Sequence, residues 1–171
     1  MIEFEVADTE FSKELMEFWR ESFLAAYGDI HSKENIAAYF SESYTMDEAT
    51  RILSEDNFVC LKANRDKKTV GIAVVNHRLC PLKKDLEASE LKHLYLLPSE
   101  YGSGLAQEMM DKVFERVKNE GKEYVWLSVS KLNNRAQRFY EKLGFELLGR
   151  GDDIYVGDEV LPSEIMLKRI D

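Results

Sequence analysis

A segment with two glycines, set between an apolar run and an amphipathic stretch, limits the folds open to this chain more than any other feature. It consists of Tyr101, Gly102, Ser103, Gly104, Leu105 and Ala106. The surrounding pattern predicts a strand that turns directly into a helix, with glycine supplying the positive φ angles that such turns need. Free N–H groups at the start of a helix favour a phosphate ligand, so a pyrophosphate fits here without any lysine. A tight turn without a ligand fits the same residues equally well.

The segment that follows carries the second part of the signal. Residues 122–129 alternate and are rich in valine, tyrosine and tryptophan, which predicts a strand. Asn133 then caps a predicted helix that ends at Gly144. Core packing accounts for most of the inner face of this helix, but the Tyr140 hydroxyl needs a polar partner if it is buried, and a cofactor sulfur can provide one. The other inner residues are Ala136, Phe139 and Leu143.

At these residues the sequence resembles the GNAT acetyltransferases, whose phosphate loop reads Q/R-x-x-G-x-G/A and whose later signature reads N-x-x-A-x-x-F-Y-x-x-x-G-F. Residues 133–145 match the second pattern completely, whereas residues 101–106 carry Tyr101 where Gln or Arg is usual. The resemblance implies an α/β (α+β) architecture, the GNAT fold. This has a mixed, mostly antiparallel central sheet with helices on both faces and a splayed cofactor cleft. It also implies one domain over residues 1–171, with acetyl-CoA (coenzyme A) as the cofactor.

Segments outside these motifs are similar to the PaiA-type polyamine N-acetyltransferases within that superfamily. They are residues 21–23, 31–39, 155–159 and 165–168. The likeness implies a small-molecule amine acceptor such as spermidine or spermine. It further implies direct attack of the neutral amine on the acetyl thioester, without a covalent enzyme intermediate.

The resemblance assigns the cofactor's two ends to different segments. The pantetheine arm is expected along the strand at Leu94, Tyr95 and Leu96, where a backbone N–H near Leu96 stabilises the carbonyl oxygen. Residues 101–106 are expected to hold the pyrophosphate. Arg138 and Lys142 are both candidates for the 3′-phosphate, although a solvated helix face explains them equally well.

The expected chemistry centres on two residues of the second motif and one carboxylate. Tyr140 is expected to protonate or hydrogen-bond the leaving thiolate, and Asn133 to contact the cofactor or an ordered water. Many relatives place the base on the strand before the phosphate loop, but the position where the polyamine group has Glu is Lys92 here. Glu90 lies two residues earlier on the same predicted strand face and is the candidate base, acting through water. A solvated strand-end carboxylate is the alternative, and His93 is expected on the opposite face.

A cationic acceptor would need aromatic faces and acidic groups. Trp19 and Tyr27 are candidates for the aromatic faces, and His31 borders the expected acceptor entrance. Counter-charge is expected from Asp29, Glu87 or Glu90. Ordinary core and surface roles are the alternatives for each of these side chains.

Composition narrows the class of protein. With 171 residues and a net charge of −9, the chain has room for a sizeable core but lacks the basic face that nucleic-acid binding requires. Its two cysteines, Cys60 and Cys80, form no metal-like cluster and are expected to be buried thiols, so no metal site is expected. No apolar run approaches membrane-spanning length, which favours a cytoplasmic protein with no membrane partner. Family analogy adds a homodimer to these expectations.

The remaining sequence predicts alternating helices and strands. Strands are expected at 2–6, 58–63 and 69–77, helices at 8–23, 32–43 and 45–53, a polar turn at 64–68, and a closing hairpin within 145–167.

Two functions compete with polyamine acetylation. One is acetylation of proteins or peptides, and the other is acyl-CoA sensing by a regulatory protein without turnover.

Overall fold

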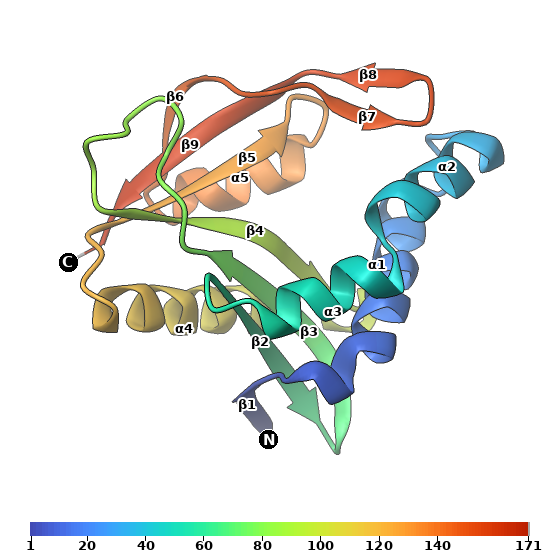
Figure 1. Cartoon of the computed structure of the whole chain (residues 1–171), viewed down its shortest axis with the longest axis horizontal. Coiled ribbons are helices and arrows are strands. Elements are labelled where there is room, and N and C mark those ends of the chain that lie inside the picture. The colour runs from blue at the N-terminus through green and yellow to red at the C-terminus, as the bar shows by residue number, and fades with distance from the viewer. Residues whose placement is uncertain (171) are drawn as a thin grey trace.

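The structure of the chain is a computed structural model that describes residues 1–170, so residue 171 of the expected domain lies outside the described part (Figure 1). A seven-stranded sheet has the order β1-β2-β3-β4-β5-β9-β6. The β4–β5 pair is parallel and the other pairs are antiparallel, which confirms the expected mixed sheet. Its strands are β1 Ile2–Val6, β2 Phe58–Arg65, β3 Lys68–Asn76, β4 Ala88–Leu96, β5 Tyr124–Ser130, β6 Glu146–Arg150 and β9 Ser163–Arg169. A separate small hairpin consists of β7 Ile154–Val156 and β8 Glu159–Leu161.

Helices cover both faces of the sheet. In the view of Figure 1, α3 lies in front of β2 and β3 with α1 to the right of these strands, while α4 lies at the lower left and α5 behind β5. Side-chain caps start three of the helices, because Ser32, Thr45 and Asn133 each accept a hydrogen bond from a backbone N–H three residues later. The helices are α1 Ser12–Tyr27, α2 Lys33–Ser43, α3 Met46–Ser54, α4 Leu105–Asn119 and α5 Asn134–Lys142, with short 3₁₀ turns at Thr9–Phe11 and Pro98–Glu100.

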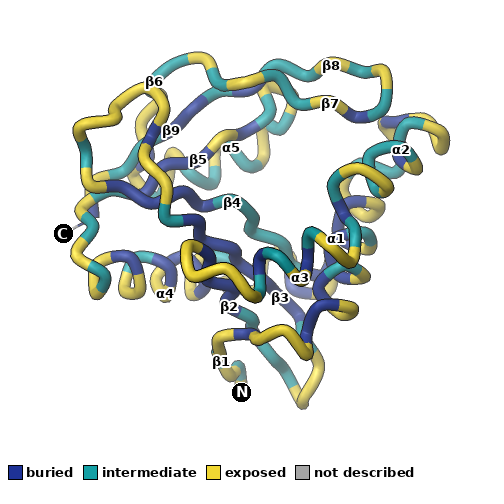
Figure 2. The backbone as a smooth tube through the Cα atoms, in the orientation of Figure 1, coloured by how far each residue is buried: buried dark blue, intermediate teal, exposed yellow. Residues whose placement is uncertain are grey.

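The hydrophobic core lies on both sides of the central strands, which are the dark part of the tube in Figure 2. It includes Trp19 of α1, Ile72 of β3 and Met110 of α4, all fully buried. Both cysteines are free and buried, as expected. Burial raises the pKa of the Cys60 thiol to about 12, so this thiol is inert at neutral pH.

The turn between β2 and β3 is tighter than the sequence predicted. Instead of a loop at 64–68, the strands continue to Arg65 and restart at Lys68. The two residues between them, Asp66 and Lys67, have φ angles of 51° and 65°. A two-residue turn with positive φ matches the twist of paired strands, and it needs no glycine when the paired strands hold it in place.

A β-bulge at Lys92 changes which side chains of β4 share a face. Val74 lies opposite His93 but Val75 lies opposite Leu91, so Lys92 is an extra residue in β4. The alternation therefore resets, and the expectation that His93 faces away from the Glu90 side is wrong. His93 packs against Trp19 with ring centroids 5.2 Å apart, on the α1 side of the sheet.

Candidate active site

The sheet opens between β4 and β5. Parallel pairing joins three residues of each strand, Ala88–Glu90 and Tyr124–Trp126, and no further pairing between these strands is found in residues 1–170. The Leu97 N–H bonds to the Val70 carbonyl of β3 at 2.9 Å. Because backbone groups alternate along a strand, Leu94 and Leu96 direct their N–H and C=O groups away from β3 and toward the opening. The opening therefore has backbone donors and acceptors ready for an extended ligand.

The glycine segment forms a loop of exposed amides at the start of α4. Gly102 and Gly104 have φ angles of 78° and 92°, and a Cβ added at either position would meet nothing within 4 Å. Within residues 1–170, the N–H groups of Gly102, Gly104 and Ala106 have no hydrogen-bond acceptor. Three free amides beside the positive end of a 15-residue helix fit the diphosphate of coenzyme A.

An ion pair fixes the turn that precedes this loop. Arg65, at the end of β2, donates to both carboxylate oxygens of Glu100 at 3.1 and 2.9 Å. Arg65 lowers the pKa of the Glu100 carboxyl, so the pair stays charged at neutral pH. The Glu100 carbonyl in turn accepts bonds from the Ser103 N–H and hydroxyl at 3.2 and 2.8 Å. Sequence reasoning missed this pair, since nothing local links residues 35 positions apart.

Asn133 connects the start of α5 to the end of α1. Its Oδ1 accepts from the Ala136 N–H at 3.0 Å, and its Nδ2 donates to the Tyr27 hydroxyl at 2.6 Å. Asn133 thus fixes the hydroxyl of Tyr27, a candidate for the acceptor site at the end of α1. One N–H of the Asn133 amide is left for another partner.

Tyr140 lies on the inner face of α5. Its ring packs against Phe139 and Phe145 with centroids 5.3 and 5.5 Å away. Burial raises the pKa of Tyr140 above its usual value, and the nearby Tyr27 hydroxyl raises it further. Among residues 1–170, no partner is found for the Tyr140 hydroxyl. It is therefore a protonated donor with free hydrogen-bonding capacity at neutral pH.

Further tyrosines line the same region on the α1 side. The hydroxyls of Tyr44 and Tyr95 are 2.5 Å apart, and burial raises the pKa of both groups. Tyr39 packs on Tyr44 with ring centroids 5.0 Å apart. The backbone of Tyr95 pairs with β3, so this residue offers its side chain to the site instead of the backbone groups expected from the sequence. Tyr39 and Tyr44 belong to no sequence motif, so the cluster was not predicted.

Glu90 is buried at the base of the opening. Its carboxylate accepts a bond from the Asn76 amide at 3.1 Å and lies 3.6 Å from the Arg78 Nε. Neither group was expected from the sequence. The Glu90 carboxylate therefore already contacts a neutral donor and a cation. To act as a base, it would have to accept a proton while it keeps both contacts.

Two expected acceptor contacts do not face the opening. Trp19 is 0% exposed and belongs to the core, so it does not line the opening. The His31 ring is buried against the β7–β8 hairpin, where Nδ1 lies 2.5 Å from the Glu159 carboxylate. Asn35 adds bonds from its amide to Asp158 and Glu159 at 2.7 and 3.0 Å. His31 thus fastens the hairpin to the start of α2, the contact seen between β7–β8 and α2 in Figure 1.

Arg138 and Lys142 are exposed on α5, in accord with either role considered for them. Arg135, on the same helix, was not singled out by the sequence. Its guanidinium carbon lies 4.2 Å from the centroid of the Tyr101 ring. This contact joins α5 to the glycine loop.

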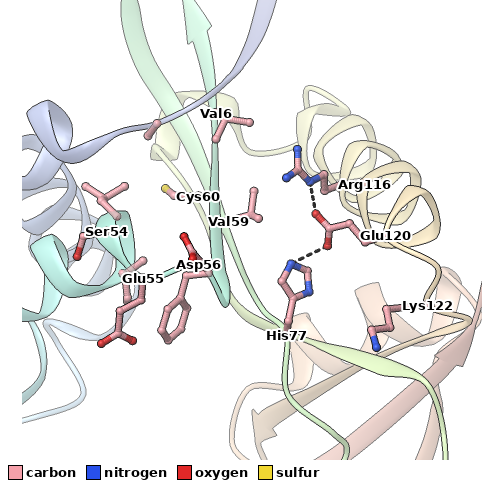
Figure 3. A pocket seen from close by; sticks show the side chains of 14 residues that line it. Val6, Ser54, Glu55, Asp56, Val59, Cys60, His77, Arg116, Glu120 and Lys122 are labelled. Atoms are coloured by element: carbon pink, nitrogen blue, oxygen red, sulfur yellow. Dashed lines mark hydrogen bonds and ion pairs between the residues drawn. The ribbon is translucent and has the colours of Figure 1, made fainter.

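Two cavities lie on the protein surface away from the glycine loop. One of about 500 Å³, drawn in Figure 3, lies between the ends of α3 and α4. The Glu120 carboxylate lies there 2.6 Å from the His77 Nε2 and 2.5 Å from the Arg116 Nε. The other, of about 300 Å³, opens on the α1 side of β4. It is lined by Tyr39, Glu42, Ser43, Tyr44, Glu48, Lys92 and His93.

The buried His93 makes the free energy of unfolding depend on pH. Burial, with a smaller contribution from Lys92, lowers its pKa from 6.5 to about 3. Below pH 6.5 the unfolded chain binds a proton that the folded chain excludes, so stability is lost as the pH falls from 6.5 toward 3, by up to about 1.4 kcal/mol per pH unit. Urea unfolding measures the free energy of unfolding at pH 7 and at pH 4.5. The drop in this free energy between the two pH values should be roughly 2–3 kcal/mol smaller for His93→Phe than for the unsubstituted protein. Equal losses would contradict the prediction.

Comparison with known proteins decides the family. Residues 12–145 match the acetyltransferase (GNAT) family. This chain belongs to the GNAT acetyltransferases. The enzyme is accordingly an acetyl-CoA-dependent acetyltransferase.

Relatives and solved structures agree with this assignment. An uncharacterized N-acetyltransferase of Mycobacterium bovis is 34% identical over 116 residues, covering 68% of this enzyme and 70% of the relative. One from Archaeoglobus fulgidus is 27% identical over 89 residues, covering 52% and 60%. The fold is similar to PaiA N-acetyltransferase from Thermoplasma acidophilum in complex with coenzyme A, with TM-score 0.77, 24% identity and 99% of each chain covered. It is also similar to the ribosomal-protein-S18-alanine N-acetyltransferase of Escherichia coli, with TM-score 0.69, 17% identity and coverage of 100% and 95%.

Neither a membrane-spanning helix nor a metal-binding cluster is found among the described residues of the acetyltransferase. Across residues 1–170, no helix has the length and apolarity to cross a membrane. The same residues contain no group of three or more His, Cys, Asp or Glu side chains placed to hold a metal ion.

Proposed function

We propose that this enzyme transfers an acetyl group to a primary amine by direct attack, with Tyr140 assisting the departing thiolate. Acetyl-CoA supplies the reactive thioester. The observation that carries the proposal is the combination of free amides at Gly102, Gly104 and Ala106 with a free, protonated Tyr140 hydroxyl. Diphosphate binding and thiolate protonation need these two features.

The backbone holds and orients the cofactor in this proposal. The free amides of the glycine loop bind the diphosphate, and Ser103 and Leu105 shape the loop around them, since the Leu105 N–H bonds to the Ser103 hydroxyl at 3.2 Å. Leu94 and Leu96 pair with the pantetheine arm in place of the missing strand contacts. Asn133 contributes its remaining N–H, while Arg138 and Lys142 stay candidates for the 3′-phosphate.

Proton transfer involves two groups at opposite sides of the reaction. A raised pKa keeps Tyr140 protonated, so its hydroxyl can donate to sulfur as negative charge develops there. The attacking amine must lose a proton, because alkyl amines are cationic at neutral pH. Glu90 accepts this proton through water, and Arg78 at 3.6 Å stabilises the carboxylate between turnovers.

A polyamine is the acceptor class that we favour. Support comes from the net charge of −9, from the likeness to PaiA-type enzymes, and from Glu42 beside Tyr39 in the cavity on the α1 side. Lys92 lines the same cavity and disfavours a second ammonium at its own position. An acceptor with both an amine and a carboxylate is the alternative that Lys92 favours.

A thiol-release assay with acetyl-CoA tests the acceptor. The panel contains spermidine, spermine, short monoamines, aminoglycosides, amino acids and short peptides. Selective turnover of spermidine or spermine is expected. Turnover of peptides alone would replace the proposal by protein acetylation, and turnover of amino acids alone would assign Lys92 to a carboxylate. Binding of acetyl-CoA with no turnover of any amine would favour a sensor.

The homodimer, the cytoplasmic location and the single domain over residues 1–171 stay predictions. Sedimentation equilibrium at micromolar concentration tests the first of them.

A further inference from the structure

Arg135 occupies an unusual position for a cation. It is the second residue of α5, and the first turn of this helix contains no acidic residue. Within residues 1–170, no carboxylate lies within 4 Å of its guanidinium nitrogens. A cation near a helix N-terminus is also disfavoured by the helix dipole. Neither ion pairing nor helix stability explains the placement.

The partner that holds Arg135 is an aromatic ring in the glycine loop. The guanidinium carbon lies 4.2 Å from the Tyr101 ring centroid, within the range of a cation–π contact. Tyr101 directly precedes Gly102, whose N–H is one of the three free amides. A guanidinium that stacks on a ring through its face keeps its edge N–H donors free. The stack therefore brings a free cationic donor group next to the loop.

We propose that Arg135 binds the diphosphate of coenzyme A and that Tyr101 positions it for this contact. The inference rests on the cofactor site proposed above. Tyr101 has no charged donor of its own, and its stack with Arg135 brings one to the loop from a different helix. The donor thus comes from α5, across the opening, while the free amides come from the start of α4. The diphosphate would then be held from both sides.

Binding calorimetry with coenzyme A, 3′-dephospho-coenzyme A and pantetheine tests the proposal. Arg135→Gln should weaken coenzyme A and the dephospho form about tenfold or more, because hydrogen bonds to charged groups are among the stronger ones. Pantetheine, which lacks the diphosphate, should bind the variant and the unsubstituted protein equally. Arg138→Gln is the matched control, one turn further along the same exposed helix, and should leave the dephospho form unaffected.

Changes at position 101 separate positioning from structure. Tyr101→Leu removes the ring and should weaken both diphosphate ligands by a smaller factor than Arg135→Gln. Tyr101→Gln placed in the Arg135→Gln background should recover part of the lost affinity by supplying a donor from the loop itself. Thermal unfolding of each variant checks that the fold is intact.

The outcomes are distinct. Unchanged affinity of Arg135→Gln for the dephospho form would overturn the proposal, and a loss confined to coenzyme A would move Arg135 to the 3′-phosphate. If the unsubstituted protein itself did not bind coenzyme A, the proposed cofactor site would be wrong. This outcome is distinct from an unchanged affinity in Arg135→Gln, which overturns only the role of Arg135.

Discussion

Replacing Tyr140 with phenylalanine should lower kcat about a hundredfold while leaving the Kd for coenzyme A nearly unchanged. The change removes one hydroxyl and keeps the ring that packs on Phe139 and Phe145. Because that hydroxyl donates to sulfur only as the thiolate forms, its loss acts on the transition state and not on ground-state binding. Steady-state kinetics and calorimetry together provide the measurement.

Tyr124→Phe is the matched control, since it removes a hydroxyl at the start of β5, where that strand is paired with β4. It should retain the unsubstituted kcat. The pH profile adds a second test. With its pKa raised above 10, Tyr140 should cause no alkaline loss of activity below pH 10. A Tyr140→Phe enzyme with full kcat would assign the thiolate proton to another donor, with Tyr95 the first to examine.

Gly104→Val should raise the Kd for coenzyme A about a hundredfold, which corresponds to about 3 kcal/mol. A branched side chain over the loop would keep the diphosphate from the amides, and two hydrogen bonds to a charged group account for an energy of about this size. The free protein has open space at this position, so the substitution should not clash within the unliganded fold.

Gly121→Val controls for backbone strain. Gly121 has a φ of 77° with nothing within 4 Å of an added Cβ, the same situation as Gly104 at 92°, but it follows the far end of α4. Both variants should lose similar stability, roughly 1–2 kcal/mol for a side chain at positive φ. Equal weakening of coenzyme A binding by the two would mean that strain, and not access to the loop, is responsible.

Local chemistry explains which features the sequence predicted. The Asn133 cap and the start of α4 at Gly104 depend on a few adjacent residues, so the printed sequence contains what determines them. The mixed, mostly antiparallel sheet and its splayed opening were implied by resemblance to a known family and not by periodicity. Two motifs were enough for this, because each has a fixed structural context.

The rest depends on contacts between distant residues. The bulge at Lys92 follows from the pairing of β4 with β3, and no local pattern marks it. The His31–Glu159 contact joins residues 128 positions apart. His31, which was predicted to border the acceptor entrance, therefore holds the β7–β8 hairpin instead. Trp19 is likewise excluded from the site only by the packing around it. Such distant contacts exclude Trp19 and His31 from the acceptor end, whereas the residues of the cofactor end stay predictions.

The short pairing between β4 and β5 also bears on how long the enzyme survives in a cell. Three residues of each strand are paired, and the backbone groups of Leu94 and Leu96 that face the opening lie beyond this pairing. A ligand that binds the folded chain alone adds about 2.7 kcal/mol to its stability at one hundred times its Kd. Abundance of the enzyme would then follow the supply of acetyl-CoA, because molecules without it open more often and are degraded sooner.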